Sequence, residues 1–194
     1  MRTIKKVASH IFIDGFGGMT QGLFATLIIG TMIQQIGLLI GGSTGNVIYL
    51  LGKAAAALTS AGIGVGVAVK YGESPLVTVS AAVAAMVGGY AGKITGGTFF
   101  VDGNAVLAGP GEPLGAFIAA FAGITCGHLV SGKTKVDIIV TPVITIGAGS
   151  VVGLLVGPPI SQMMTGLGSI INWATEQRPF IMGIVVSVVM GMVL

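Results

Sequence analysis

The stretch GFGGMTQGLFATLIIGTMIQQIGLLIGGSTGNVIYLLG, residues 15–52, contains no Asp, Glu, Lys, Arg or His and is bracketed by Asp14 and Lys53. A second uncharged stretch runs from Ile138 to Thr175. A helix that crosses the hydrocarbon core of a bilayer needs about 20 mostly apolar residues, and a charge at its centre costs roughly 2.5–3.5 kcal/mol. Each stretch is therefore long enough to hold a full transmembrane span.

The composition of the whole chain supports the same conclusion. Hydrophobic residues make up 53% of the 194 residues and charged residues only 8%, whereas soluble domains carry about 25% charged residues. The apolar blocks follow one another along the chain, unlike the single short block of a signal peptide. We predict an all-α, polytopic integral membrane bundle that forms one transmembrane domain over residues 1–194.

The blocks between charged residues predict six spans and their orientation. They are Met19–Ile40, Asn46–Val69, Pro75–Gly92, Pro113–Val130, Val136–Val156 and a last span that begins at Pro179. Basic residues concentrate in alternate connecting segments, at Arg2, Lys5, Lys6, Lys70, Lys133 and Lys135. The positive-inside rule places these segments and the N-terminus in the cytoplasm, and residues 41–44, 93–112 and 158–178 on the other face. Lys93 and Arg178 are the exceptions to this pattern.

The last apolar block, Phe180–Leu194, is about fifteen residues long, shorter than the roughly 20 that a span needs. We therefore expect the chain to be the N-terminal portion of a longer membrane domain.

The 34 glycines of the chain lie mostly inside the apolar blocks and allow two interpretations. Small residues let transmembrane helices pack closely, as in Gly18-x-x-x-Gly22 and Gly123-x-x-x-Gly127. Alternatively, Gly and Pro interrupt spans so that free backbone groups line a cavity, as in transporters. Thr141-Pro142 and Gly157-Pro158-Pro159 favour the second interpretation, so we predict interrupted and re-entrant helices as well.

Glu112 is the first candidate for substrate contact, within GPGEPLG at residues 109–115. Its carboxylate can accept hydrogen bonds from adjacent sugar hydroxyls or act as a general base. The alternative is a helix N-terminal carboxylate stabilised by the helix dipole. Residues 95–112 form a Gly-rich polar insert that we expect to fold back as a re-entrant lid.

Four further residues are candidates for substrate contact: Asp102, Asn46, Lys53 and His128. Asp102 follows the aromatic pair Phe99-Phe100, and its alternative role is a turn at Asp102-Gly103-Asn104. Asn46 and Lys53 are seven residues apart and share a helical face. Interhelical hydrogen bonding and snorkelling are their alternatives. The alternative for His128 is a polar residue at the headgroup level of its span.

Several classes of function are excluded or lack support. The single cysteine, Cys126, cannot form a disulfide within the chain, and no Cys/His cluster has zinc spacing, so we expect no metal or other cofactor. The pattern Gly-x-x-x-x-Gly-Lys-Ser/Thr occurs once, as GHLVSGKT at residues 127–134, but it begins inside a predicted apolar span and does not follow a strand, so we do not expect it to bind phosphate. No catalytic constellation is evident, and nothing indicates nucleic-acid binding. Energy for transport must come from ions, a partner protein or chemistry on the substrate.

Four segments resemble one family of membrane proteins, in the same order along the chain. They are IDGF at 13–16 continuing into MTQGLFATLIIGTMIQQIG at 19–37, SGKTKVDIIVTPVITI at 131–146, GPPIS at 157–161 and INWATEQRPFIMGIVVSVVMGM at 171–192. They resemble the second type of EIIC membrane component of the bacterial phosphoenolpyruvate-dependent sugar phosphotransferase system.

The resemblance implies a homodimeric sugar permease in the bacterial plasma membrane. Its substrate would be phosphorylated by a cytoplasmic EIIB partner, with phosphate from a phosphoprotein and not from ATP. In the glucose-type branch of the system a Glu-Pro turn and a histidine contact the sugar, and Gly111-Glu112-Pro113 and His128 look similar.

Two other functions stay open on the sequence. An ion-coupled secondary transporter or channel would transport without a phosphoryl donor. A non-transporting regulatory subunit would bind a partner protein, through a surface around Lys133 and Lys135, but no sugar.

Overall fold

Helices make up most of the chain in the computed structural model, which describes residues 10–101, 104–107, 109–175, 183 and 187–188. The chain divides into two compact units, Met1–Pro158 and Pro159–Leu194. The arrangement described below is that of the first unit. The expectation of one transmembrane domain over residues 1–194 stays a prediction.

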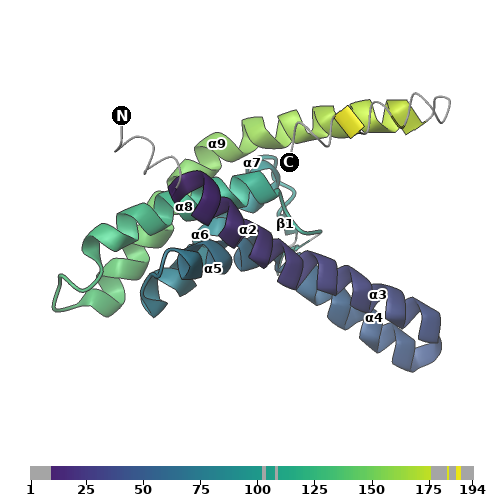
Figure 1. The fold of residues 1–194 in the computed structure, drawn as a ribbon, viewed down its shortest axis with the longest axis horizontal. Helices are drawn as coiled ribbons and strands as arrows, with labels where there is room; N and C mark the ends of the chain where they lie inside the picture. The colour runs from purple at the N-terminus through teal and green to yellow at the C-terminus, as the bar shows by residue number, and fades with distance from the viewer. Residues whose placement is uncertain (1–9, 102–103, 108, 176–182, 184–186, 189–194) are drawn as a thin grey trace. The chain divides into compact units, whose positions relative to one another are not determined.

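The first span is a continuous helical segment built from η1 (His10–Gly15), α2 (Phe16–Leu23), η2 (Phe24–Ile28) and α3 (Ile29–Ile40), of which η1 and η2 are π-helical. Ile13–Ile40 is long and apolar enough to cross a membrane, so the helix begins before the predicted start at Met19. Gly41 ends it with a φ of 66°, a left-handed conformation that glycine adopts readily. The chain then reverses, and α3 lies beside α4 (Gly42–Ala57) as a hairpin (Figure 1).

The second span is broken, as the prediction of interrupted helices required, but at Leu58 and not at a glycine or proline. Helix α4 ends at Ala57, α5 (Thr59–Lys70) follows, and the two are bent by 53°. Side chains satisfy carbonyls at the broken end of α4: the Thr59 hydroxyl donates to Ala56 O at 2.6 Å, and the Tyr90 hydroxyl donates to Ala57 O at 3.2 Å. The π-helical η2 packs against both α4 and α5.

A short helix and a small hairpin separate the next two apolar helices. Helix α6 (Pro75–Gly89) begins behind the N-cap Ser74 and is 15 residues long, three residues shorter than predicted at its C-terminal end. Helix α7 (Ala91–Thr95) follows, and then strands β1 (Phe100–Val101) and β2 (Asn104–Ala105) pair as an antiparallel hairpin. Helix α8 (Pro113–Val130) has the predicted bounds and is a candidate span.

Helix α9 (Asp137–Thr175) continues through Thr141-Pro142 and Gly157-Pro158-Pro159, so the predicted breaks at these prolines are wrong. So is the expected end of this span at Val156, because the helix extends over most of the predicted outer segment 158–178. Transmembrane helices tolerate proline where neighbouring groups satisfy the freed carbonyls. Near Pro142, the Asp137 carboxylate strengthens the helix start by accepting from Gly132 N at 2.9 Å and Thr141 Oγ1 at 2.6 Å.

The span predicted from Pro179 falls outside the described residues apart from 183, 187 and 188.

Glycines allow the helices of the first unit to touch through their backbones. A Cβ atom on Gly22 would come within 2.3 Å of Gly62 O, and one on Gly66 within 2.2 Å of Gly18 O, so α2 and α5 are in direct backbone contact. The same holds for α8 against α9, where a Cβ on Gly123 would lie 2.7 Å from Thr145 O. The packing interpretation is therefore the right one for Gly18, Gly22 and Gly123.

Candidate functional site

The loop Gly109–Glu112 brings Glu112 to the start of α8. Gly109 and Gly111 adopt φ values of 81° and 75°, which turn the chain sharply before Pro113. Glu112 occupies the N-cap position with extended backbone angles, and its N–H donates to Gly89 O at 2.7 Å. The loop therefore reaches the end of α6.

Two side chains tether the same loop to other elements. The Tyr90 hydroxyl donates to Gly109 O, and Ser60 Oγ, in the first turn of α5, donates to Pro110 O at 2.9 Å. A Cβ atom on Gly111 would lie 2.5 Å from Ser60 Oγ and 3.0 Å from Gly89 O, so only glycine fits there. The loop is held against the broken second span and the end of α6.

The surroundings of the Glu112 carboxyl combine a cation with aromatic rings. Glu112 precedes the span that begins at Pro113, and burial raises the pKa of its carboxyl while the nearby Lys93 ammonium lowers it. Lys93 Nζ lies 5.3 Å from the centre of the Tyr90 ring, and the Phe99 ring lies 5.4 Å from the Tyr90 ring. We call Ser60, Tyr90, Lys93, Phe99 and Glu112 the Glu112 site.

This combination of groups suits a polyhydroxylated ligand. A carboxylate accepts hydrogen bonds from adjacent hydroxyls, and an ammonium donates to ligand oxygens. The half-buried Phe99 ring can supply an apolar face, whereas Tyr90 is 1% exposed and its hydroxyl is bonded within the protein. Irregular backbone, as in the loop Gly109–Glu112, is tolerated at membrane depth where it is buried in protein or lines a water-filled cavity.

The structure does not gather the other predicted contact residues around Glu112. His128 is at the opposite end of α8, about 24 Å away at 1.5 Å per residue. Asn46 and Lys53 are exposed on α4, and Lys53 is about one turn before the broken end of that helix. Asp102 lies outside the described residues. Substrate contact by each of the five residues stays a prediction.

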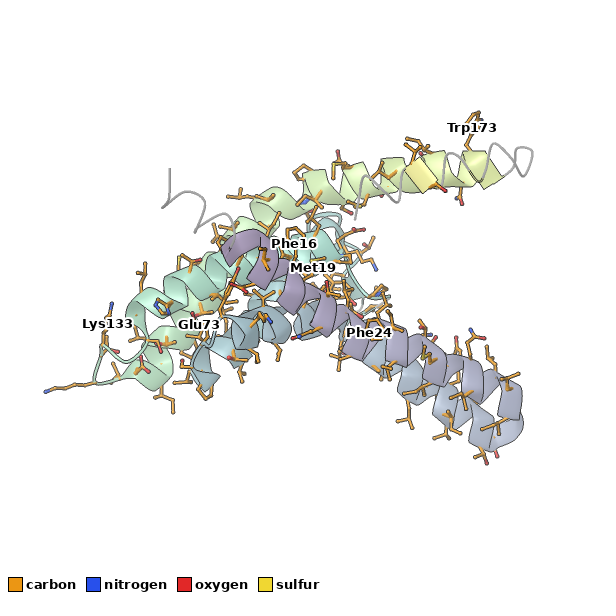
Figure 2. The ribbon with its side chains drawn as sticks, in the orientation of Figure 1. Phe16, Met19, Phe24, Glu73, Lys133 and Trp173 are labelled. Carbon is orange, nitrogen blue, oxygen red and sulfur yellow. The ribbon has the colours of Figure 1, made fainter. Side chains whose placement is uncertain are left out.

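His128 belongs to a second group of polar residues, which joins two loops. Its Nδ1 lies 3.0 Å from Glu73 Oε1, and Ser74 Oγ lies 3.0 Å from Ser131 Oγ. These contacts hold the α5–α6 connection to the connection between α8 and α9, which carries the exposed Lys133 and Lys135. Figure 2 labels Glu73 and Lys133 at this end of the unit. We call this end, with Lys70, the basic end.

Sequence reasoning missed Tyr90, Ser60 and Glu73. Tyr90 was the residue with a usable signal, because it directly follows an apolar helix and a phenol buried among apolar helices needs a hydrogen-bond partner. Ser60 offered no comparable signal, since its partner Pro110 O is 50 residues away in the sequence.

The fold and its candidate spans define a helical membrane protein. Residues 13–194 match the sequence model of the family described as "Phosphotransferase system, EIIC", and the chain belongs to this family. It is therefore a membrane component of a sugar-transporting phosphotransferase system. No curated protein and no solved structure matches the chain.

Proposed function

We propose that the chain translocates a carbohydrate across the bacterial plasma membrane, for phosphorylation by a cytoplasmic EIIB partner, and works as a homodimer. Membership of the EIIC family supports the sugar and the partner. The tethered loop is the observation that supports the location of the sugar site. Three hydrogen bonds hold residues 109–112 against a broken span, and the partly buried Glu112 is at the end of this loop.

The Glu112 site and the basic end are separated by about the thickness of a bilayer. Helix α8 has 18 residues, which is about 27 Å at 1.5 Å per residue, against roughly 30 Å of hydrocarbon. In the proposed orientation, with the N-terminus in the cytoplasm, sugar enters at Glu112 from outside. Lys70, Lys133 and Lys135 then face the cytoplasm, where ammonium groups attract a partner that carries phosphate.

Ligand-induced stabilisation tests the site directly. We expect one sugar or sugar acid from a panel to raise the melting temperature of the detergent-purified protein in a concentration-dependent way. Glu112→Gln should abolish this response, because an amide cannot accept hydrogen bonds on both of its polar atoms. Glu73→Gln, the matched change at the basic end, should retain it.

Other outcomes of the same panel favour the alternative functions. A response to a monovalent ion alone favours ion-coupled transport, and sealed vesicles would then show uptake without a phosphoryl donor. A response to nothing in the panel favours a regulatory subunit that binds a protein partner.

The pH dependence of sugar binding should report the Glu112 carboxyl. Burial raises its pKa above the ordinary value of 4.5, so the ionised acceptor is present above the shifted pKa and disappears as pH falls through it. Sugar affinity should therefore decline at a higher pH than an exposed carboxyl would give. Isothermal titration calorimetry between pH 4 and pH 8 measures this decline. Glu112→Asp, which keeps a carboxyl at this position, should keep a pH-dependent sugar affinity. An acid-induced loss of structure elsewhere in the protein would give a different pH dependence.

The contribution of the Glu112 carboxyl to the stability of the ligand-free protein should have the opposite pH dependence. A carboxyl whose pKa is raised by folding stabilises the folded state fully below its unfolded pKa, and this contribution is lost as pH rises through the folded pKa.

A further inference from the structure

Tyr90 joins two parts of the chain that belong to different elements. Its side chain is 1% exposed, and its hydroxyl lies within hydrogen-bond distance of Ala57 O, at the last residue of α4, and of Gly109 O, in the Glu112 loop. A phenol carries one proton, so the two carbonyls share a single donor. Tyr90 therefore links the broken end of α4 to the loop.

Ser60 makes the corresponding connection from the other side of the break. It lies in the first turn of α5, is fully buried, and donates to Pro110 O at 2.9 Å. The break at Leu58 separates α4 from α5, so Tyr90 contacts the half before the break and Ser60 belongs to the half after it. The loop that ends at Glu112 is thereby attached to both halves of the broken span.

The backbone of the loop contributes a third attachment, from Glu112 N to Gly89 O at 2.7 Å. Gly89 directly precedes Tyr90, and a Cβ on Gly89 would come within 2.2 Å of Ser60 Oγ, so α6, α5 and the loop meet with no space between them. A change in the bend at Leu58 must therefore displace the loop or break one of these bonds.

We propose that Tyr90 is a positioning residue of the Glu112 site, acting with Ser60 to set the place of the Glu112 carboxyl from the geometry of the broken second span. The substrate role of that carboxyl rests on the proposed function, whereas the mechanical link is measurable without any sugar.

Tyr90→Phe tests this link, because it removes the hydroxyl and keeps the buried ring. In full-length protein in lipid nanodiscs, hydrogen–deuterium exchange should accelerate about tenfold at residues 109–112 and also at residues 57–62, while α2 and α8 stay as in the wild type. Labelling of Glu112 by dicyclohexylcarbodiimide, which reacts with protonated carboxyls, should reach half-maximum at a lower pH, since a loosened loop hydrates the carboxyl. Tyr49→Phe, on α4, is the matched control and should change neither readout.

Ser60→Ala provides an independent variant, with Ser80→Ala as its control, since Ser80 is also buried and, among the described residues, donates to Leu76 O in its own helix. The proposal is overturned if Tyr90→Phe and Ser60→Ala leave exchange at residues 109–112 unchanged. It is equally overturned if exchange rises evenly over all helices, which would indicate a role in general stability.

The sugar measurements separate this proposal from the proposed function. Accelerated exchange in Tyr90→Phe together with normal sugar binding by Glu112→Gln would keep the link and refute the sugar site. Loss of sugar binding in Glu112→Gln with unchanged exchange in Tyr90→Phe would support the sugar site and refute the link. If both proposals hold, Tyr90→Phe should weaken binding of the sugar that stabilises the wild type about fivefold.

Discussion

Replacing Gly66 with alanine is expected to destabilise the folded protein by about 3 kcal/mol, at the upper end of the range for inserting a methyl group into a tightly packed interior. The new Cβ would lie 2.2 Å from Gly18 O and 3.2 Å from Gly22 N, both of them backbone atoms of α2. No side chain can rotate away from this contact, so α2 and α5 must separate along their shared surface. Thermal unfolding in detergent, followed by circular dichroism, measures the loss.

The matched control is Gly147→Ala, in α9, where a Cβ would meet nothing within 4 Å. Alanine favours helix over glycine by roughly 0.8–1 kcal/mol, so this variant should be as stable as the wild type or slightly more stable. The two substitutions are chemically identical and differ in what the methyl group meets. Equal stability of the two variants would show that α2 and α5 are not in backbone contact in the detergent-solubilised protein.

Reversing two charges at the basic end should reduce phosphorylation-coupled uptake at least tenfold. In the variant Lys133→Glu/Lys135→Glu, two exposed ammonium groups become carboxylates, which repel a phosphate-bearing partner and slow its association. Proteoliposomes that contain the purified chain, phosphorylated EIIB and the stabilising sugar give the measurement. Sugar-induced stabilisation should be retained, because the Glu112 site is at the other end of α8.

The conservative double variant Lys133→Arg/Lys135→Arg keeps both charges and should transport at close to the wild-type rate. Uptake by the wild type should also fall as salt is added, because contacts between exposed charges are screened beyond about 10 Å at 0.1 M ionic strength. Normal coupled uptake by the charge-reversed variant would place the EIIB contact elsewhere on the chain.

Local sequence signals were sufficient where one short segment decides the structure. Pro113 after Glu112 predicted the start of α8 correctly, because proline suits the first turn of a helix, and the uncharged block after it predicted the rest of that span. Prolines inside α9 misled the same reasoning. Their effect on a helix depends on whether neighbouring groups satisfy the freed carbonyls, which the sequence does not show.

The candidate site was predictable only in part. Glu112 stood out because a carboxylate between glycines and prolines beside an apolar block is unusual. Glu112 and His128, both candidates for sugar contact, are at opposite ends of one helix, and His128 pairs with Glu73. Sugar contact by either residue stays a prediction. Tyr90 and Ser60 were missed because their partners are 19 and 50 residues away along the chain.

The sequence alone determined that this chain is a helical membrane protein, where most of its apolar helices lie, and which family it resembles. The first two properties depend on the cost of charge in hydrocarbon and on local helix signals, both of which act within about 20 residues. The resemblance depends on the order of four short segments along the chain. Only the tertiary structure decided that the second span breaks at Leu58, that glycines of α2 and α5 meet, and that Tyr90 and Ser60 hold the Glu112 loop. Each of these depends on which distant backbone groups come within contact distance, and packing decides that after the helices have formed.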